Sequence, residues 1–454
     1  MLIILVGLTS RAVHQLNKDQ APVIYPAVTT VYQSLGLYSI EGKSWEDIKK
    51  AGYGTSVTAN IFASGASAWF KNYLTPMVAK EYGINLKVNE IKSTSYAVNN
   101  VTYEVATNSP GTIDLVWING ANFKTMKSKK LLYGPWTDKV PSSSNFDWQS
   151  PDLAFDFGEP TKGLEMPFFQ AQMVFVYDGA RVHKQDLPQS MEELVRFVTD
   201  PYHALYRKFT YAAPAVMQNG NAIPGDFTGA AFLKMFLYAF GGGYENYSGL
   251  YDKTKLDAVT KNVLAKLKSL ESGILRDPNN LSNPYYCTSQ SDCNDLFKTG
   301  KIVFTMSYNP NIVGANAGSG WPVLANSYIP SEGSLTNLNF IAIPINAPNI
   351  HGALLVGNYI GSFAAQFSRS ASKYRWIMPY SETSPGYADV EAGGWQTAFE
   401  WLSNNLKYNT TPPEAFFRKP YALPEPTADY ASQLDAYWYM CLIDSPPTLP
   451  PNLC

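Results

Sequence analysis

Charged residues and histidines are scarce in this sequence. Asp, Glu, Lys and Arg make up 16% of the 454 residues, and His occurs four times. An ordinary soluble domain has roughly 25% charged residues. The net charge of −2, with no basic stripe or acidic tail, excludes nucleic acid as a partner. No histidine is close to a cysteine in the sequence, so we expect no metal centre of the His/Cys type.

The short motifs of the common catalytic classes are also absent. The sequence has no G-x-S-x-G elbow, no H-E-x-x-H motif, no Walker loop and no dinucleotide fingerprint. The glycine run at 241–243 is more typical of a helix end than of a phosphate cradle. We therefore expect a protein that is not an enzyme and has no cofactor.

Long apolar runs are missing as well. The run at residues 2–8 is far shorter than the roughly 18–20 residues that span a bilayer. It is interpreted as the core of a secretory signal peptide, or alternatively as a first buried strand. We expect no transmembrane segment and an extracellular location, secreted or periplasmic.

Cysteine is rare, and the four cysteines form two local pairs, Cys287 with Cys293 and Cys441 with Cys454. An even number in polar surroundings predicts two disulfides in an oxidising compartment, whereas the alternative is four free thiols. Four N-x-S/T sequons are compatible with a secreted glycoprotein, at Asn100, Asn246, Asn280 and Asn409.

Aromatic residues are abundant, with 30 Tyr and 10 Trp. They provide amphipathic surface without charge, which suits extracellular surfaces and ligand clefts. Strands alternate with helices, as in the strand 54–63, helix 68–82 and strand 85–91, so we predict an α/β fold. The apolar strand at 113–118 ends in the turn Asn119–Gly120 and leads into a helix. Open α/β sheets bind ligands at such turns.

Two predicted strands, near 168–178 and 338–346, are expected to leave one lobe and enter the other. The first is unusually long for a strand of a globular sheet. Together with the length of the chain, they predict two discontinuous lobes with a cleft between them. The expected division is a leader and arm (1–50), lobe 1 (51–175 and 341–405), lobe 2 (176–340 and 406–440) and a Pro-rich tail (441–454).

Six sequence blocks occur in a fixed order across roughly residues 50–440. They are IDLVWINGANFKTMKSKKLLYGPW (113–136), EMPFFQAQMVFVYD (165–178), PGDFTGAAFL (224–233), FTMSYNP (304–310), FIAIPINA (340–347) and LPEPTADYASQLDAYW (423–438). In this the sequence resembles the bacterial extracellular solute-binding proteins of ABC importers, most closely the YnjB-type branch, which is related to thiamine-, iron- and polyamine-binding proteins.

The resemblance implies a two-lobed periplasmic-binding-protein type 2 fold that closes on a small ligand by hinge motion, without catalysis. The cysteine pairs, the long N-terminal arm and the Pro-rich tail depart from the bacterial pattern, and no lipobox cysteine follows the leader. These departures put coupling to an importer in doubt.

Turns at strand ends from both lobes are expected to line the cleft. The candidate ligand-binding residues are Ser64, Ser67, Trp117, Asn119, Gly120, Asn122, Gln170, Gln172, Asp226, Thr228, Tyr308 and Asn309. Phe169 and Asn358 are additional candidates. Each has a structural alternative: the serines, Asp226 and Thr228 would cap helices, Trp117 would be core, and the remaining turns would only reverse the chain. Gln170 and Gln172 share one face of their strand, so the alternative to lining the cleft is that both face solvent.

The function predicted is capture of one small polar ligand, a thiamine-like cation, a polyamine, a metal or a sugar. The partner besides the ligand would be an ABC importer permease in a bacterium. The alternative function is that of an extracellular structural or surface-assembly glycoprotein, with self-assembly partners, built on a solute-binding scaffold in a eukaryote.

Overall fold

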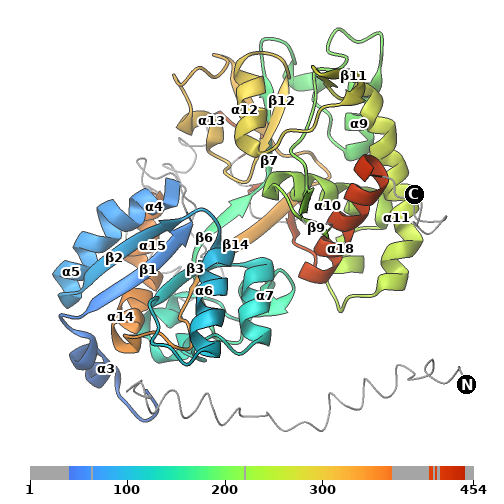
Figure 1. Cartoon of the computed structure of the whole chain (residues 1–454). Helices are drawn as coiled ribbons and strands as arrows, with labels where there is room; N and C mark the ends of the chain where they lie inside the picture. The colour runs from blue at the N-terminus through green and yellow to red at the C-terminus, as the bar shows by residue number, and fades with distance from the viewer. Residues whose placement is uncertain are drawn as a thin grey trace, which may run out of the picture.

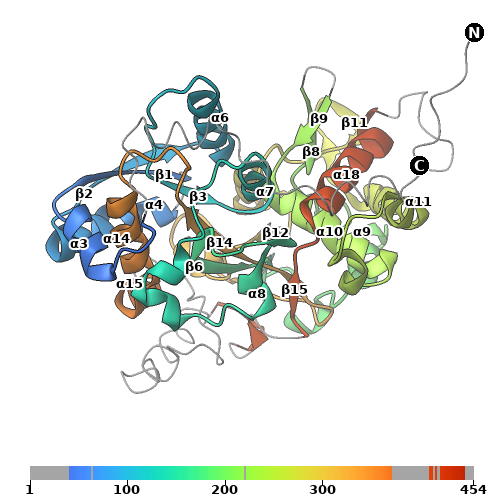
Figure 2. The same ribbon diagram turned by 90° about the horizontal axis from the view of Figure 1, so that it is seen from below.

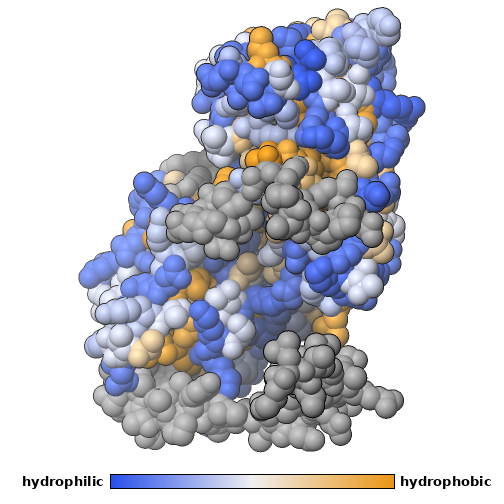
Figure 3. All heavy atoms as spheres, turned by 45° about the vertical axis from the view of Figure 1, so that its right-hand side comes forward, coloured by the Kyte–Doolittle hydropathy of each residue, from blue (hydrophilic) through white to orange (hydrophobic). Residues whose placement is uncertain are grey.

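Two lobes, each with its own sheet and hydrophobic core, make up the molecule (Figure 1). The computed structural model describes residues 40–62, 65–218, 221–370, 408–412, 415–416 and 420–444. Strands and helices alternate, and the predicted α/β class is confirmed. Most of the face in Figure 3 is hydrophilic, and apolar residues show at the junction of the two lobes.

The sheet of the first lobe has the order β15-β14-β3-β1-β2, and β6 pairs with β14 as well. Strands β1 (Ser56–Phe62), β2 (Asn85–Ile91) and β3 (Leu115–Ile118) run parallel, as the predicted βαβ unit requires. Strand β1 alternates between buried and more exposed positions, because one face packs on the core and the other on neighbouring segments. Its buried side chains are Val57, Ala59 and Ile61.

A continuous helical segment connects β1 to β2. It consists of α4 (Gly65–Trp69), a π-helical turn η1 (Phe70–Leu74) and α5 (Thr75–Tyr82). Gly83 ends it in a left-handed conformation with φ of 63°, which glycine adopts at little cost. The predicted helix over 68–82 is confirmed.

Two chain crossings join the lobes. Strand β6 (Glu165–Gln172) pairs with β14 (Ser334–Ala342), and β7 (Val174–Asp178) continues as the central strand of the second sheet. That sheet has the order β12-β7-β13. The long strand predicted over 165–178 is thus divided at Met173, whose N–H donates to the Leu335 carbonyl at 2.9 Å. The two halves belong to different sheets, as the length of the strand indicated.

The second lobe is built around the apolar helix α10 (Phe227–Gly241). Helices α9 (Met191–Thr199), α11 (Lys253–Leu270) and α18 (Ala428–Trp438) pack against it. Figure 2 shows these four helices on one side of the crossing strands and α3, α14 and α15 on the other. Because α18 comes from near the C-terminus, the second lobe is discontinuous in sequence.

Further helices and strands complete the two lobes. They are α3 (Trp45–Gly52), α6 (Thr94–Ala106), α7 (Gly120–Ser128), α8 (Pro151–Ala154), β4 (Phe155–Asp156), β5 (Glu159–Pro160), β8 (Ala215–Gln218), β9 (Asn221–Pro224), α12 (Gln290–Lys298), β12 (Phe304–Ser307), β13 (Ala325–Tyr328), α14 (Ile350–Gly361), α15 (Phe363–Ser370) and β15 (Ala422–Pro424). No described helix combines the length and the apolar character needed to cross a membrane.

Some local predictions differ from the structure, and one lies outside the described residues. Residues 45–52, expected in the N-terminal arm, form α3, which begins with a capping box at Ser44 and packs on α14. The hairpin β8–β9 was not predicted, and each of its strands has only four residues. The helix expected over 395–406 falls outside the described residues.

The disulfide between Cys287 and Cys293 is confirmed, with a Cα–Cα distance of 5.5 Å. It lies in a small buried cluster with Phe297 and Trp321. Cys441 is not a free thiol, but Cys454 lies outside the described residues, so this second pairing stays a prediction.

Glycosylation of the sequons also stays a prediction, and the structure separates them by access. Asn100 and Asn280 are exposed. Asn246 and Asn409 are half-buried, and their amide nitrogens donate to Gly242 O at 2.6 Å and to Ser327 Oγ at 2.9 Å. The amide nitrogen of the exposed Asn100 also donates, to Glu104 Oε1 at 3.1 Å and to Thr112 Oγ1 at 3.0 Å, so a glycan at any of these three residues would have to displace hydrogen bonds.

Replacing both Cys287 and Cys293 by Ala will lower the free energy of unfolding by about 2 kcal/mol, because a short covalent loop no longer restricts the unfolded chain. Urea unfolding followed by tryptophan fluorescence measures the loss. The wild-type protein treated with reductant serves as the control and should unfold at a similarly lowered urea concentration. An unchanged midpoint in the double variant would contradict the stabilising role.

Candidate functional site

Two asparagines of β14 lie where the first lobe meets the second. Asn339 Oδ1 accepts hydrogen bonds from Trp117 Nε1 at 2.9 Å and from Asn119 Nδ2 at 3.2 Å. Its own amide nitrogen donates to Asn337 Oδ1 at 3.3 Å. The crossing strand therefore joins the end of β3, one edge of the expected cleft, to a polar row that runs toward the second lobe.

Tyr308 and Glu425 continue this polar row in the second lobe. The Tyr308 hydroxyl donates to one oxygen of Glu425, and the other oxygen is paired with the Lys234 ammonium. Burial, followed by the charge of Glu425, raises the pKa of Tyr308, and the Asn337 side chain opposes this shift. Tyr308 thus stays a neutral donor at physiological pH.

A β-hairpin with a two-residue turn, formed by β4 and β5, covers the N-terminus of helix α7. The Gly120 N–H, the first of this helix, donates to Asp156 Oδ2 at 2.8 Å. Phe157 and Gly158 form the turn with φ of 46° and 74°, and the Phe157 ring lies 3.4 Å from the position that a Gly120 Cβ would take. The first N–H groups of a helix need acceptors from outside the helix, and here the Asp156 carboxyl supplies one.

The Lys234 ammonium is enclosed between the lobes. It lies 5.4 Å from the ring centroids of both Phe157 and Phe227, and it forms a buried ion pair with Glu425. The side-chain exposures of Lys234 and Glu425 are 3% and 2%. Two aromatic faces and a carboxylate form a site of the kind that holds an ammonium group. We call these three residues, Phe157, Phe227 and Glu425, the ammonium cage.

Three further carboxyl groups are buried close to the cage. Burial raises the pKa of Asp156 to about 8, and the neighbouring Glu425 adds to the shift. Burial also raises the pKa of Asp435 to about 7, although Lys234 opposes it, and raises the pKa of Glu165 well above its ordinary value. Buried carboxylates that lack cationic partners retain their protons in this way.

The carboxyl oxygens confirm this shortage of partners. Asp156 Oδ1, Asp435 Oδ1 and both oxygens of Glu165 have no hydrogen-bond partner among the described residues. Of the four buried carboxyl groups, counting Glu425, two interact with the buried Lys234 ammonium: Glu425 pairs with it, and it opposes the rise in the pKa of Asp435. The more exposed Lys127 pairs with Glu159 and opposes the rise in the pKa of Glu165. The buried carboxyl groups of this region could therefore pair with more positive charge than they do with the described side chains.

Several predicted residues come together in this region, although nothing tests them as ligand contacts. Trp117, Asn119 and Gly120 lie at the end of β3, and Tyr308 faces them from the second lobe. Gln170 is half-buried in β6, opposite Leu338 of β14.

The other first-lobe candidates lie at the edges of this region or beyond the described part. Asn122 is half-buried on α7. The Ser67 hydroxyl donates to Glu90 at the end of β2. Phe169 is buried against Trp117, with ring centroids 5.5 Å apart. Ser64 lies outside the described residues.

The remaining predicted residues have structural hydrogen bonds. Asp226 caps α10 and accepts from the Thr228 N–H at 2.8 Å, and Thr228 also donates its hydroxyl to Asp226. Asn309 accepts from the Asn311 N–H at 2.9 Å within a turn. Gln172 is fully buried and donates to the Tyr421 carbonyl at 2.9 Å. The structural alternatives named from the sequence describe the contacts of Asp226, Thr228 and Asn309. For Gln172 the solvent-facing alternative is wrong, because the side chain is buried.

Asn358 lies within the first lobe, away from β14. It accepts from the Ser142 N–H at 2.9 Å and donates to the Tyr82 hydroxyl at 3.1 Å. It therefore joins α14 to segments of the same lobe.

The sequence analysis missed the charged residues of the region, Asp156, Glu165, Lys234, Glu425 and Asp435. One signal was present: Lys234 is the single charged residue in the apolar helix FTGAAFLKMFLYAFG. A lone charge in an apolar helix is buried only with a partner. No signal in the sequence connects it to Glu425, which is 191 residues away.

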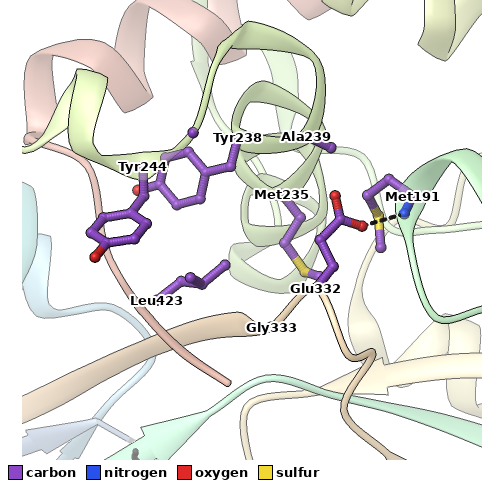
Figure 4. Close-up of a pocket in the computed structure, with 9 residues that line it drawn as sticks. Met191, Met235, Tyr238, Ala239, Tyr244, Glu332, Gly333 and Leu423 are labelled. Carbon is purple, nitrogen blue, oxygen red and sulfur yellow. Dashed lines mark hydrogen bonds between the residues drawn. The ribbon is translucent and has the colours of Figure 1, made fainter. Parts of the chain in front are cut away.

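A separate cavity of about 130 Å³ lies within the second lobe (Figure 4). Its walls are apolar apart from Glu332, whose carboxylate accepts from the Met191 N–H at 2.6 Å, and from the tyrosines Tyr238 and Tyr244. It contains none of the predicted site residues. In the described part of the chain, no group of three or more His, Cys, Asp or Glu side chains is placed to hold a metal ion.

Stability will depend on pH through Asp156. Its pKa is raised from an unfolded value of 3.8 to about 8, so its contribution to stability is complete below about pH 4 and is lost as the pH rises to 8. Asp156→Asn, which resembles the protonated side chain and still accepts from Gly120, will remove up to about 1.4 kcal/mol per pH unit of this dependence. Urea unfolding at pH 5, 6.5 and 8 measures it.

The exposed Asp138, paired with Lys139, provides the matched control. Asp138→Asn should leave the pH dependence as in the wild-type protein. Parallel curves for the wild-type and Asp156→Asn proteins would contradict a buried, protonated Asp156.

Comparison with known proteins agrees with this architecture. Residues 73–354 match the family described as bacterial extracellular solute-binding protein. The protein YnjB of Escherichia coli strain K12 is 27% identical over 352 residues, which cover 76% of this chain and 84% of YnjB.

Solved structures of ABC transporter proteins share the fold. A solute-binding protein from Thermotoga lettingae TMO, bound with alpha-D-tagatose, has a TM-score of 0.57 and 17% identity, covering 87% of this chain and 95% of its own. The spermidine/putrescine substrate-binding protein PotD from Streptococcus pneumoniae has a TM-score of 0.53 and 14% identity, covering 79% and 93%. The predicted two-lobed fold is confirmed. Because the family match covers more than half of its residues, the protein belongs to the bacterial extracellular solute-binding proteins.

Proposed function

We propose that this solute-binding protein captures a small, positively charged solute between its two lobes. The observation that carries the proposal is the group of four buried carboxyls, Asp156, Glu165, Glu425 and Asp435, of which only Glu425 has an ion pair among the described residues, with Lys234. A cationic solute would supply the positive charge that these groups lack, whereas a neutral sugar would leave the imbalance unchanged.

Aromatic side chains support a cation as well. Phe157, Phe227 and Tyr308 lie in succession, with ring centroids 6.1 and 4.7 Å apart. Aromatic faces attract ammonium groups, and the attraction is stronger when both are removed from water. The polar row Asn119–Asn339–Asn337 would accept and donate the hydrogen bonds that fix the orientation of the solute.

Entry of the solute requires the lobes to separate, because the carboxyls are buried in this closed arrangement. The chain crosses between the lobes near Met173 and through β14, and bending there would open the cleft as a hinge. Transfer of the captured solute to an ABC importer permease would follow from membership of the family.

Isothermal titration calorimetry at pH 8 with thiamine, spermidine and D-tagatose tests the proposal. We expect a cation to bind and tagatose to give no heat. Native mass spectrometry of protein from its natural source should reveal a bound cation of low mass. Binding of the sugar alone, or of none of the solutes with nothing bound in the native protein, would refute it.

Asp435→Asn will weaken binding of the cation about tenfold at pH 8, a loss of ~1.4 kcal/mol, since the carboxyl has a pKa of about 7 and is ionised there. The effect should diminish at pH 5.5, where the wild-type carboxyl is protonated too. Asp295→Asn, at an exposed ion pair with Lys298, is the control and should bind as the wild-type protein does. Equal affinities of all three proteins for the cation at pH 8 would show that Asp435 is not part of the binding site.

A further inference from the structure

We propose that Lys234 is an internal substitute for the solute: its ammonium occupies the ammonium cage in the closed, solute-free protein, and the ammonium group of the solute displaces it toward Asp435. This inference rests on the proposed function, because it identifies which part of a cationic solute is recognised and where. It predicts a solute that carries an ammonium group on an apolar stem, as the lysine side chain does.

The surroundings of the Lys234 ammonium are those of a recognition site. Two aromatic faces lie at equal distances of 5.4 Å, and Glu425 supplies the counter-charge. Glu425 is itself held by the Tyr308 hydroxyl, so its orientation is fixed independently of the lysine. Side chains of a helix lean toward its N-terminus, which explains how Lys234 reaches back over Phe227, two turns earlier on α10.

Packing alone does not explain the lysine. Burying an ion pair costs several kcal/mol of desolvation per ion, and apolar residues of similar volume are often equally stable or more stable. Lys234 lies on a helix whose neighbouring residues, Leu233 and Met235, are both buried and apolar. An apolar side chain at this position would satisfy the core, so a charge there indicates a role outside folding.

The cage is completed by both lobes. Phe227 and Glu425 belong to the second lobe, whereas Phe157 comes from the hairpin that packs on Gly120 of the first. Phe157 has a φ of 46°, a left-handed conformation that a bulky residue adopts only under constraint. An ammonium in the cage therefore holds the two lobes together, whether it comes from Lys234 or from the solute.

Asp435 offers the displaced lysine a second partner. Its Oδ1 is buried without a hydrogen-bond partner among the described residues, and only 8% of the residue is exposed. Lys234 is close enough to stabilise the ionised form of this carboxyl. The lysine can then exchange Glu425 for Asp435 without leaving a charge unpaired, while the ammonium of the solute takes over Glu425.

Chemical rescue of Lys234→Ala tests the cage directly. The substitution removes three methylene groups and the ammonium, which n-propylammonium replaces. At millimolar concentration n-propylammonium should raise the melting temperature of the variant by a few degrees. The uncharged analogue n-propanol should not. The wild-type protein should not respond, because its tethered lysine competes at a high effective concentration.

The double variant Lys234→Ala/Glu425→Gln is the matched control and should lose the response to n-propylammonium. A response that n-propanol reproduces, or that survives in the double variant, would overturn the cage as an ammonium site. If Lys234→Ala does not fold, Lys234→Met keeps the volume and removes the charge. It should bind the cationic solute about tenfold more tightly than the wild-type protein, because no tethered competitor must be displaced. Weaker binding to this variant would overturn displacement.

The two proposals fail separately. Rescue by n-propylammonium with no detectable natural solute would leave the cage intact and reject capture of a free cation. A bound cation without rescue, and with unchanged affinity in Lys234→Met, would place the solute elsewhere in the cleft and reject the role of Lys234.

Discussion

The structure depends on one constraint: β14, which joins the lobes, must satisfy its backbone hydrogen bonds with three neighbouring strands. Its first residues pair with β15, beside the second lobe, and its last residues pair with β3 in the first, while β6 pairs with it from Thr336 to Ala342. Buried N–H and C=O groups must be paired, so the two lobes cannot move independently of this strand. Any opening of the molecule must therefore bend the crossing strands instead of breaking them.

The same strand brings the polar groups together. Asn337 and Asn339 are two residues apart and therefore lie on one face of β14, from which they reach Trp117 and Asn119 on one side and Tyr308 on the other. The Trp117 ring lies at one end of this row, and Tyr308, which is bonded to Glu425, lies at the other. Buried charges interact strongly, so one additional cation would have a large effect on the protonation and pairing of its neighbours.

The residues of the site are of two kinds: those whose hydrogen bonds stabilise the fold, and those that keep polar atoms without a hydrogen-bond partner. Asp226 and Thr228 form the N-terminal cap of α10, and Gln172 forms a hydrogen bond in the core. Asp156 and Asp435 keep unpaired oxygens at positions where neutral side chains would cost less. These unpaired carboxyl oxygens are the observation on which the proposed capture of a cation rests.

The sequence by itself determined the periodic features: the βαβ unit, the strand-to-turn-to-helix segment at Trp117–Gly120, the long crossing strand and the Cys287–Cys293 bridge. These depend on contacts between near neighbours in the chain. Only the tertiary structure decided that Lys234 meets Glu425, 191 residues away, and that Phe157 covers both Gly120 and Lys234. Charge pairing over such separations leaves no local pattern, because it is fixed by how the two lobes pack and not by the spacing of residues along the chain.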